Sequence, residues 1–473
     1  MNQGERVGQA ASGGRSRRQM LLRGRLTLLL LVLLGIASAD WLIRVAAGGE
    51  SRAAADPLAI VRPAGPEPAG PPAPPLAPAQ VLSRIPVTRA LWEDLESRAP
   101  ASASTRNRIV ELVPRPDSRP DLAGPLAVEY TLDTDLMHSV FRILKRGRVA
   151  LGHVIVMDPA TGRVLVYAST DLERFPPDRA YPAASLVKVI TAAAALHHAP
   201  EASRDSCRTV GNPYRLTRRR IDPTKGGRAV SLRRALATSN NQCFAQLAVH
   251  QLGSHNLLGA IDRFGWLLPP APLHPAGEVE PAGEDEFALG KLGSGLSGTR
   301  ITPLHAAQLA GTLARGRRTP PFWITQVRDG EGHPLLLPRQ PASVVMTSDL
   351  ARELREMLVD TTVRGTARRA FRTRRGPLLG PIRVAGKTGS LSGTEPRGRY
   401  EWFIGVAPAD DPRVVVAAVV VQGSRWWVTP SQVAAEVLKG VFCPRGVCDP
   451  EAADRWLDPQ PEPEPRPTLI ASG

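Results

Sequence analysis

The chain has 473 residues, enough for one large catalytic domain with additional segments. Hydrophobic residues make up 42% and charged residues 22%, which excludes a mainly disordered chain, although 46 prolines predict loose segments. The formal net charge of +16 indicates an acidic partner, such as nucleic acid, an anionic surface or an anionic substrate, unless a general arginine bias explains it.

The amino end has the pattern of an export signal. Residues 1–25 contain six arginines and one acid, and residues 26–39 carry no charge. Small residues at 37–39 fit a cleavage site, whereas the apolar residues that follow would extend an uncleaved helix. We favour a membrane anchor at 26–43, with residues 1–25 in the cytoplasm. Both alternatives, anchor or cleaved signal, place the rest of the chain outside the cytoplasm, in the periplasm.

Proline separates this segment from the folded part. Residues 44–86 predict an extended Pro- and Ala-rich linker, because ten of the thirty residues from Pro57 to Pro86 are proline. Residues 87–127 predict a small pedestal without chemistry, and residues 443–473 a Pro- and Glu-rich tail.

Export also determines how the four cysteines are interpreted. In an oxidising compartment an even number of cysteines predicts disulfides. Cys443 and Cys448 bracket a turn-like loop and are the preferred pair, and Cys207 with Cys243 follows by elimination. The alternative is four buried free thiols. Because the nine histidines form no ligand-spaced cluster with these cysteines, we expect no metal, and no cofactor.

Hydrophobic periodicity predicts the elements of a domain at residues 128–442. Apolar strands surround turn residues twice, first at 152–157 and 163–168 and again at 401–406 and 414–421. Helical patterns occupy the following ranges: 133–145, 185–199, 231–252, 302–315, 347–359 and 433–441. Strands at both ends with helices between them predict an α+β fold, an antiparallel sheet flanked by helices with an all-helical lobe.

A serine and a lysine open one predicted helix. In Ser185-Leu186-Val187-Lys188 the two side chains share a helical face, so the amine can reach the hydroxyl. A desolvated lysine loses its proton more easily and can act as general base for a serine nucleophile. The spacing also arises by chance on exposed helices, but the apolar residues after Lys188 predict burial.

A second polar string, Ser239-Asn240-Asn241, interrupts the next helical region. A hydroxyl and a carboxamide two residues apart in a turn can relay a proton and bind a substrate amide. Helix capping is the alternative interpretation of Ser239 and Asn241.

A third string, Lys387-Thr388-Gly389-Ser390, is extended. On an edge strand it can bind a substrate laid alongside, and its cation can hold a carboxylate. A charged strand end in a turn is the alternative interpretation.

Together the three strings are far more specific than each alone. Their order and spacing match the S-x-x-K, S-x-N and K-T-G set of serine enzymes that act on D-alanyl peptides or β-lactams. The chain therefore resembles the transpeptidase domain of penicillin-binding proteins over about residues 128–442. Further stretches carry the resemblance: the helix led by Thr131-Leu132-Asp133, the hairpin from Gly152, GTRITPLHAAQLAGTLARG at 298–316, RGTARRA at 364–370 and EWFIGVAPADDPRVVVAAVV at 401–420.

The resemblance implies a role for each residue. Ser185 attacks the carbonyl between two D-alanines of a peptidoglycan stem peptide, Lys188 takes its proton, and Ser239 passes a proton to the leaving amine with help from Lys387. The implied substrate-binding residues are Asn241, Thr388, Gly389 and Ser390, with the backbone N–H groups of Ser185 and Ser390 as oxyanion hole. The implied partners are stem peptides, covalently bound β-lactams and the cytoplasmic membrane.

Several alternatives stay open. The chain before residue 128 is too short for the glycosyltransferase domain of bifunctional relatives, so a separate glycosyltransferase is a candidate partner. A D,D-carboxypeptidase or a β-lactamase would share the motifs, and Glu284, Asp285 and Glu286 are candidates for a deacylating base by position only. A non-catalytic sensor or scaffold is a further alternative. Nucleic acid is not expected, since aromatic residues are only 5% and the domain is exported.

The positive charge is concentrated around the motifs. Residues 204–234 contain ten Lys or Arg and two acids, and residues 364–399 contain ten and one. We expect these clusters to line or approach the active-site cleft and to attract anionic peptidoglycan or anionic partners.

Overall fold

The computed structural model describes residues 109–457, apart from residues 118, 202–206, 273, 281, 336–338 and 424–425. The predicted cytoplasmic segment, anchor and linker, most of the pedestal and the end of the tail lie outside these residues. Within the described part of the chain, no helix combines the length and apolarity needed to cross a membrane.

A five-stranded antiparallel sheet forms the centre of the domain, in the strand order β16-β17-β18-β3-β4. Its strands are β3 (Gly152–Met157), β4 (Val164–Ser169), β16 (Ala385–Thr394), β17 (Arg397–Ala407) and β18 (Val414–Gln422). Both predicted hairpins are confirmed, and β18 joins them by pairing with β3, so strands more than 200 residues apart are neighbours. The third polar string lies in β16, at the edge of the sheet, as predicted.

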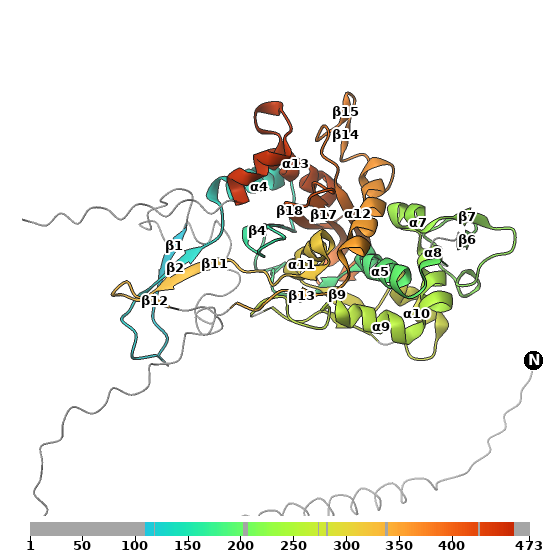
Figure 1. Ribbon diagram of the computed structural model, residues 1–473, viewed down its shortest axis with the longest axis horizontal. Coiled ribbons are helices and arrows are strands. Elements are labelled where there is room, and N and C mark those ends of the chain that lie inside the picture. The colour runs from blue at the N-terminus through green and yellow to red at the C-terminus, as the bar shows by residue number, and fades with distance from the viewer. Residues whose placement is uncertain are drawn as a thin grey trace, which may run out of the picture. The chain divides into compact units, whose positions relative to one another are not determined.

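Helices cover both faces of this sheet. In β3, Val154 and Val156 pack into one apolar cluster while Ile155 and Met157 pack into another, as strand alternation requires. The first cluster includes α4 (Thr134–Arg146) and α13 (Pro430–Phe442), which lie together in Figure 1, and α11 (Pro303–Arg315) packs on the opposite face. The predicted α+β architecture is therefore confirmed for the described domain.

Side-chain caps fix where several of these helices begin. Asp133, Thr302, Thr347 and Thr429 each accept a hydrogen bond from the backbone N–H three residues later. Thr429 and Gln432 form a complete capping box ahead of α13.

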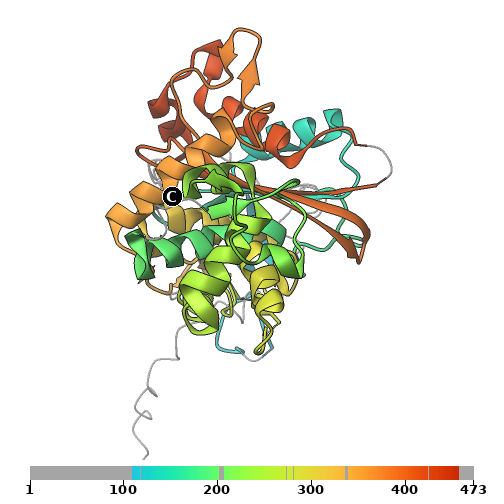
Figure 2. The ribbon, with the colours of Figure 1, turned by 90° about the vertical axis from the view of Figure 1, so that its right-hand side faces the viewer.

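A helical lobe covers the β16 end of the sheet (Figures 1 and 2). It contains α5 (Lys188–His198), α7 (Leu232–Thr238), α8 (Asn241–Gln246), the π-helical turn η4 (Leu247–Leu252), α9 (Gly253–Arg263) and α10 (Glu286–Ser294). The helix α12 (Ser348–Val363) packs against both α7 and β16. The helical pattern predicted at 231–252 is divided by a turn at Ser239, where the second polar string was expected to interrupt it.

A second sheet was not anticipated from the sequence. Its strand order is β1-β2-β11-β12, built from β1 (Val110–Val113), β2 (Leu126–Tyr130), β11 (Ile324–Arg328) and β12 (Pro334–Leu335). The predicted boundary at residue 128 falls inside β2, and the proposed division into segments stays a prediction.

Short elements connect the larger ones. The strands are β5 (Tyr181–Pro182), β6 (Cys207–Thr209), β7 (Arg228–Val230), β8 (Glu278–Val279), β9 (Thr299–Ile301), β10 (Arg317–Arg318), β13 (Ser343–Val344), β14 (Arg372–Thr373) and β15 (Gly376–Pro377). The helical turns are η2 (Ala184–Val187), η3 (Arg218–Arg220), η5 (Pro444–Gly446), η6 (Pro450–Ala453) and α14 (Asp454–Leu457).

Both predicted disulfides are present. Cys207 of β6 is bonded to Cys243 of α8, and Cys443 is bonded to Cys448 just after α13. No cysteine is free, so the alternative of four thiols is wrong.

Candidate active site

Ser185 lies in a tight turn immediately before α5. The preceding residue, Ala184, has a φ of +51°, a conformation that residues with a Cβ adopt only when their surroundings impose it. Gly295 supplies that constraint, because it packs so closely on the Ala184 carbonyl that a Cβ at this position would overlap it. The turn that presents Ser185 is therefore held by backbone packing.

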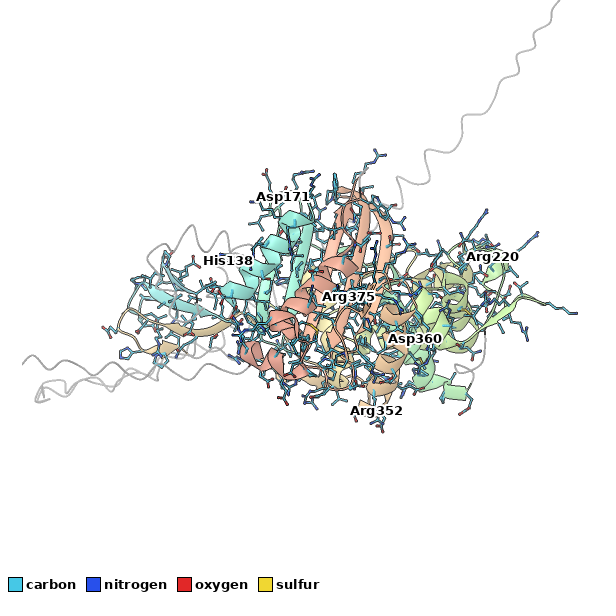
Figure 3. All side chains as sticks on the ribbon, turned by 90° about the horizontal axis from the view of Figure 1, so that it is seen from above. His138, Asp171, Arg220, Arg352, Asp360 and Arg375 are labelled. Atoms are coloured by element: carbon cyan, nitrogen blue, oxygen red, sulfur yellow. A yellow bond between two sulfur atoms is a disulfide. The ribbon has the colours of Figure 1, made fainter. Side chains whose placement is uncertain are left out.

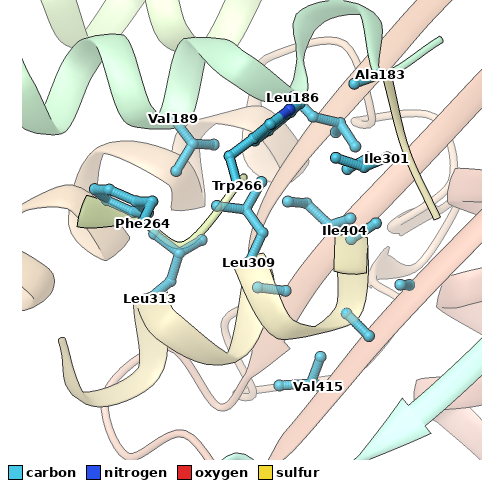
Figure 4. Close-up of a cluster of buried hydrophobic side chains, with 14 of the residues drawn as sticks. Ala183, Leu186, Val189, Phe264, Trp266, Ile301, Leu309, Leu313, Ile404 and Val415 are labelled. Carbon is cyan, nitrogen blue, oxygen red and sulfur yellow. The ribbon is translucent and has the colours of Figure 1, made fainter. Parts of the chain in front are cut away.

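A hydrophobic core lies below this turn. Figure 4 shows Leu186 and Val189, two and one residues from Lys188 in sequence, next to Leu309 and Leu313 of α11 and to Ile404 of β17. All belong to one buried cluster. Because cores of this density allow little movement, the position of Ser185 is fixed relative to the sheet.

Lys188 is fully buried and has three oxygen neighbours. Its Nζ lies 2.7 Å from Oγ of Ser185 and 2.7 Å from Oδ1 of Asn241, and it also donates to the backbone carbonyl of Ser294. Burial lowers the pKa of Lys188 well below its usual range, and the charge of Lys387 lowers this pKa further.

This environment suits an uncharged amine. A neutral amine has two N–H bonds and one lone pair, and the oxygens of Asn241 and Ser294 can only accept hydrogen bonds. With both N–H bonds used there, the lone pair is directed at Ser185, whose O–H can donate to it. The arrangement is that of a general base next to a nucleophile.

Ser239 and Lys387 form a second pair of the same residue types. Ser239 ends α7 with a φ of +55°, and its Oγ accepts a hydrogen bond of 3.0 Å from Nζ of Lys387. The same Nζ donates to the Thr388 carbonyl at 2.6 Å. Lys387 is fully buried, which lowers its pKa to about 7.

Asn241 connects the lysine to a surface loop. Its Oδ1 accepts from Lys188, while its Nδ2 donates to the Tyr214 carbonyl at 2.7 Å. The neighbouring Asn240 caps α8 by accepting from the Cys243 N–H. Asn240 therefore caps the helix, and the side chain of Asn241 contacts Lys188 instead.

The edge strand β16 brings the third string against the nucleophile turn. Gly389 lies so close to the turn that an added Cβ would be 3.2 Å from the Ala183 carbonyl oxygen. Thr388 and Ser390 are half-buried, and each hydroxyl has one side-chain partner, Thr366 at 2.6 Å and Arg399 at 2.6 Å. All eight predicted site residues therefore lie in one connected region.

Three further residues contact this region and were not singled out from the sequence. Ser294 acts through its carbonyl, which no residue type reveals. Thr366 lies in the stretch RGTARRA, noted only as part of the resemblance, and its N–H donates to the Ala237 carbonyl beside Ser239. Arg399 had no sequence signal apart from the basic cluster.

The acids proposed by position as a deacylating base lie in a capping turn. Asp285 accepts from the Phe287 N–H at the start of α10 and forms an ion pair of 2.9 Å with Arg218, which lowers the pKa of Asp285. Among the described residues, no three His, Cys, Asp or Glu side chains gather as metal ligands.

The two basic clusters are partly neutralised by acids on the surface. Arg233 and Arg364 both lie within 4.0 Å of Asp360, and Arg383 pairs with Glu356 at 2.9 Å. Arg220 of the first cluster lies on the helical lobe (Figure 3). The second cluster nevertheless supplies Lys387 and Arg399 to the site itself.

Comparison with known proteins agrees with this geometry. Residues 152–442 match the family model described as the penicillin binding protein transpeptidase domain. A peptidoglycan D,D-transpeptidase PbpA of Mycolicibacterium smegmatis is 28% identical over 314 residues, covering 58% of this chain and 62% of the relative. PbpA of Mycobacterium tuberculosis is 30% identical over 276 residues, covering 55% and 54%. This chain thus spans less than two thirds of either relative.

Solved structures share the fold. Penicillin-binding protein A of M. tuberculosis, as an imipenem acyl-enzyme complex, is 22% identical, with a TM-score of 0.55 over 66% of this chain and 78% of that one. Pseudomonas aeruginosa PBP2 in complex with WCK 5153 is 21% identical, with a TM-score of 0.55 over 69% and 81%. At these identities the likeness establishes the fold alone.

Proposed function

Because the chain belongs to the penicillin-binding protein transpeptidase domain family, we propose that it is a serine D,D-transpeptidase that cross-links peptidoglycan. The observation that carries this proposal is the buried Lys188 amine, 2.7 Å from the Ser185 hydroxyl, with its other two contacts made to oxygens that only accept.

In the first step Ser185 forms the acyl-enzyme. Its Oγ attacks the carbonyl carbon between the two terminal D-alanines while Lys188 takes the proton. The backbone N–H groups of Ser185 and Ser390 stabilise the oxyanion. As the C–N bond breaks, Ser239 donates its proton to the leaving D-alanine and regains one from protonated Lys387, which is hydrogen-bonded to its hydroxyl.

In the second step the amine of a neighbouring stem peptide attacks the ester carbonyl and loses a proton through Ser239 to Lys387, while Lys188 returns its proton to the departing Ser185 oxygen. During both steps Asn241 holds the substrate amide, and Thr388, Gly389 and Ser390 bind the strand that carries the terminal carboxylate. A β-lactam presents a strained amide and a carboxylate in the same places and therefore acylates Ser185 without a rapid second step.

The relatives support this outcome over hydrolysis. The two PbpA proteins are named as peptidoglycan D,D-transpeptidases, and one solved relative is an acyl-enzyme with imipenem. In this chain Asp285 is paired with Arg218 and caps a helix, which argues against its use as a deacylating base. Carboxypeptidase and β-lactamase activities are the outcomes against which the proposal is tested.

The domain acts outside the cytoplasmic membrane, in the periplasm. The basic residues 1–25, the apolar segment 26–43 and the Pro-rich linker 44–86 support a single-pass anchor with a stalk. Two oxidised cysteine pairs agree with export. The basic clusters attract anionic peptidoglycan strands, and a separate glycosyltransferase supplies the glycan.

Labelling with a fluorescent penicillin tests the proposal. The full-length protein in detergent should retain a covalent label for hours, and Ser185→Ala should abolish it while the matched Ser392→Ala retains it. Incubation with a pentapeptide donor and an amine acceptor should release D-alanine and form a cross-linked product. Rapid turnover of the drug would indicate a β-lactamase, release of D-alanine without cross-link a carboxypeptidase, and no label at all would refute every enzymatic alternative.

A further inference from the structure

One cation reaches the substrate-binding strand from its neighbour. Arg399 lies on β17, directly opposite Ser392 of β16. Its side chain runs along the sheet to Ser390, and its Nε donates to Ser390 Oγ at 2.6 Å. Because Thr388, Ser390 and Ser392 alternate on one face of β16, the guanidinium lies on the face that carries the hydroxyls of the third string.

This hydrogen bond decides which way the Ser390 hydroxyl can act. A hydroxyl has one O–H donor, and here the oxygen already accepts from Arg399. The Ser390 O–H is therefore available to donate to a ligand. Thr388, two residues earlier, shares a hydrogen bond of 2.6 Å with Thr366, in which either hydroxyl can be the donor.

Arg399 also differs from the two lysines in its charge at neutral pH. Burial lowers the pKa of Lys387 to about 7 and that of Lys188 well below its usual range, so neither lysine guarantees a positive charge at neutral pH. A guanidinium stays protonated under these conditions. Arg399 is thus a permanent cation joined to the string by a hydrogen bond.

The surroundings leave the guanidinium free to bind. Its side chain is 48% exposed, its Cζ lies 5.7 Å from the Trp426 ring centre, and among the described residues nothing accepts from its two Nη groups. One acid is near, Glu401, 3.9 Å from Nε. Burial raises the pKa of Glu401, and Gln422 donates to this carboxyl group at 3.3 Å, so Glu401 competes weakly.

We propose that Arg399 binds the terminal carboxylate of the acyl donor together with Ser390 and so makes the enzyme selective for anionic donors. The inference rests on the proposed function. A guanidinium and a hydroxyl on one strand face provide a charge-assisted site for a carboxylate that ends beside β16. Arg399 is then a specificity-determining residue that acts on binding and leaves proton transfer to the lysines.

The test compares a charged with a neutral form of one acylating agent. Benzylpenicillin and its methyl ester differ only in the carboxylate, and second-order acylation rates are measured with the full chain. In Arg399→Gln the rate with the acid should fall about tenfold to a hundredfold, and Arg399→Lys should recover part of it. With the ester the variants should match the wild type. Arg397→Gln, which removes an exposed cation two residues away on the same strand face, should change neither rate.

The outcomes separate this inference from the proposed function. If the wild type is not acylated, the proposed function fails. If the wild type is acylated but Arg399→Gln keeps its rate with the acid, or loses the same factor with acid and ester, the carboxylate role of Arg399 is refuted. Unchanged thermal melting of Arg399→Lys and Arg397→Gln confirms that the comparison is made between folded proteins.

Discussion

The site contains two buried lysine and serine pairs in different surroundings. Lys188 and Ser185 lie on the helical lobe, where the lysine meets three oxygens and the charge of a second lysine. Lys387 and Ser239 join the sheet edge to α7, and this lysine has two oxygen partners. Both lysines are fully buried, which lowers the pKa of each, and the charge of Lys387 lowers the pKa of Lys188 further.

The different surroundings of Lys188 and Lys387 explain how two lysines can have different roles in catalysis. Lys387, with a pKa of about 7, is still partly protonated near neutral pH, and its charge adds to the burial that lowers the pKa of Lys188. One lysine is then available as base and the other as cation, which is the separation that acid and base catalysis needs.

The largest expected effect comes from removing the base. Lys188→Gln should lower the second-order rate of acylation by penicillin about 10⁴-fold, because a general base is lost. Lys387→Gln should lower it only about 10²-fold, because a hydrogen bond and a charge are lost. Acylation kinetics followed by fluorescence measure both rates. Equal losses in the two variants would mean that the pairs do not have distinct tasks.

The two disulfides should contribute unequally to the free energy of unfolding. The bond between Cys207 and Cys243 joins residues 36 positions apart in the sequence and lies next to Asn241. The bond between Cys443 and Cys448 joins residues only 5 positions apart and lies outside the site. Replacing each pair by serine should lower the free energy of unfolding by about 4 and about 2 kcal/mol, respectively, from the chain-entropy cost of each loop.

Urea unfolding measures these two losses. Acylation should also slow in the Cys207/Cys243 variant, since α8 carries Asn241, and should be unchanged in the Cys443/Cys448 variant. The reverse order of losses would contradict the assignment of the first bond to the lobe that holds Lys188.

A smaller effect is expected from replacing the uncharged Asn241, which accepts a hydrogen bond from Lys188, by a carboxylate. Asn241→Asp places a carboxylate where Oδ1 now lies 2.7 Å from Nζ, and an opposite charge raises the pKa of an amine. The fraction of free amine at pH 7 should fall, so acylation at pH 7 should drop about tenfold below that of the wild type, and the ratio of the two rates should recover as pH rises. Asn241→Ala, which adds no charge, should show no such recovery. Parallel pH profiles for the two variants would count against Lys188 as the base.

Much of this molecule could be predicted from the sequence. The hairpin strands around residues 158–162 and 408–412 alternate apolar residues between turn residues, which is a local signal, and both are present. The serine, lysine and K-T-G strings are likewise short and specific. Both disulfides followed from export and from the small number of possible pairings.

The contacts that complete the site could not be predicted, because they join segments distant in the chain. Ser294 offers a backbone carbonyl to Lys188 from 106 residues away. Thr366 and Arg399 reach β16 only after the sheet and α12 have assembled. The turn at Ser239 was expected from the polar string, but its left-handed backbone was not, because a serine gives no sequence signal for that conformation.

The pH dependence of acylation tests the central claim most directly. Rates with penicillin are measured from pH 5 to 10 for the wild type and for Lys387→Arg, which keeps a charge at this position at every pH used. The wild-type rate should decline as pH rises through about 7, where Lys387 loses its proton, and this decline should disappear in Lys387→Arg. A wild-type rate that rises steadily through pH 7, or a decline that persists in Lys387→Arg, would contradict the division of labour between the two lysines.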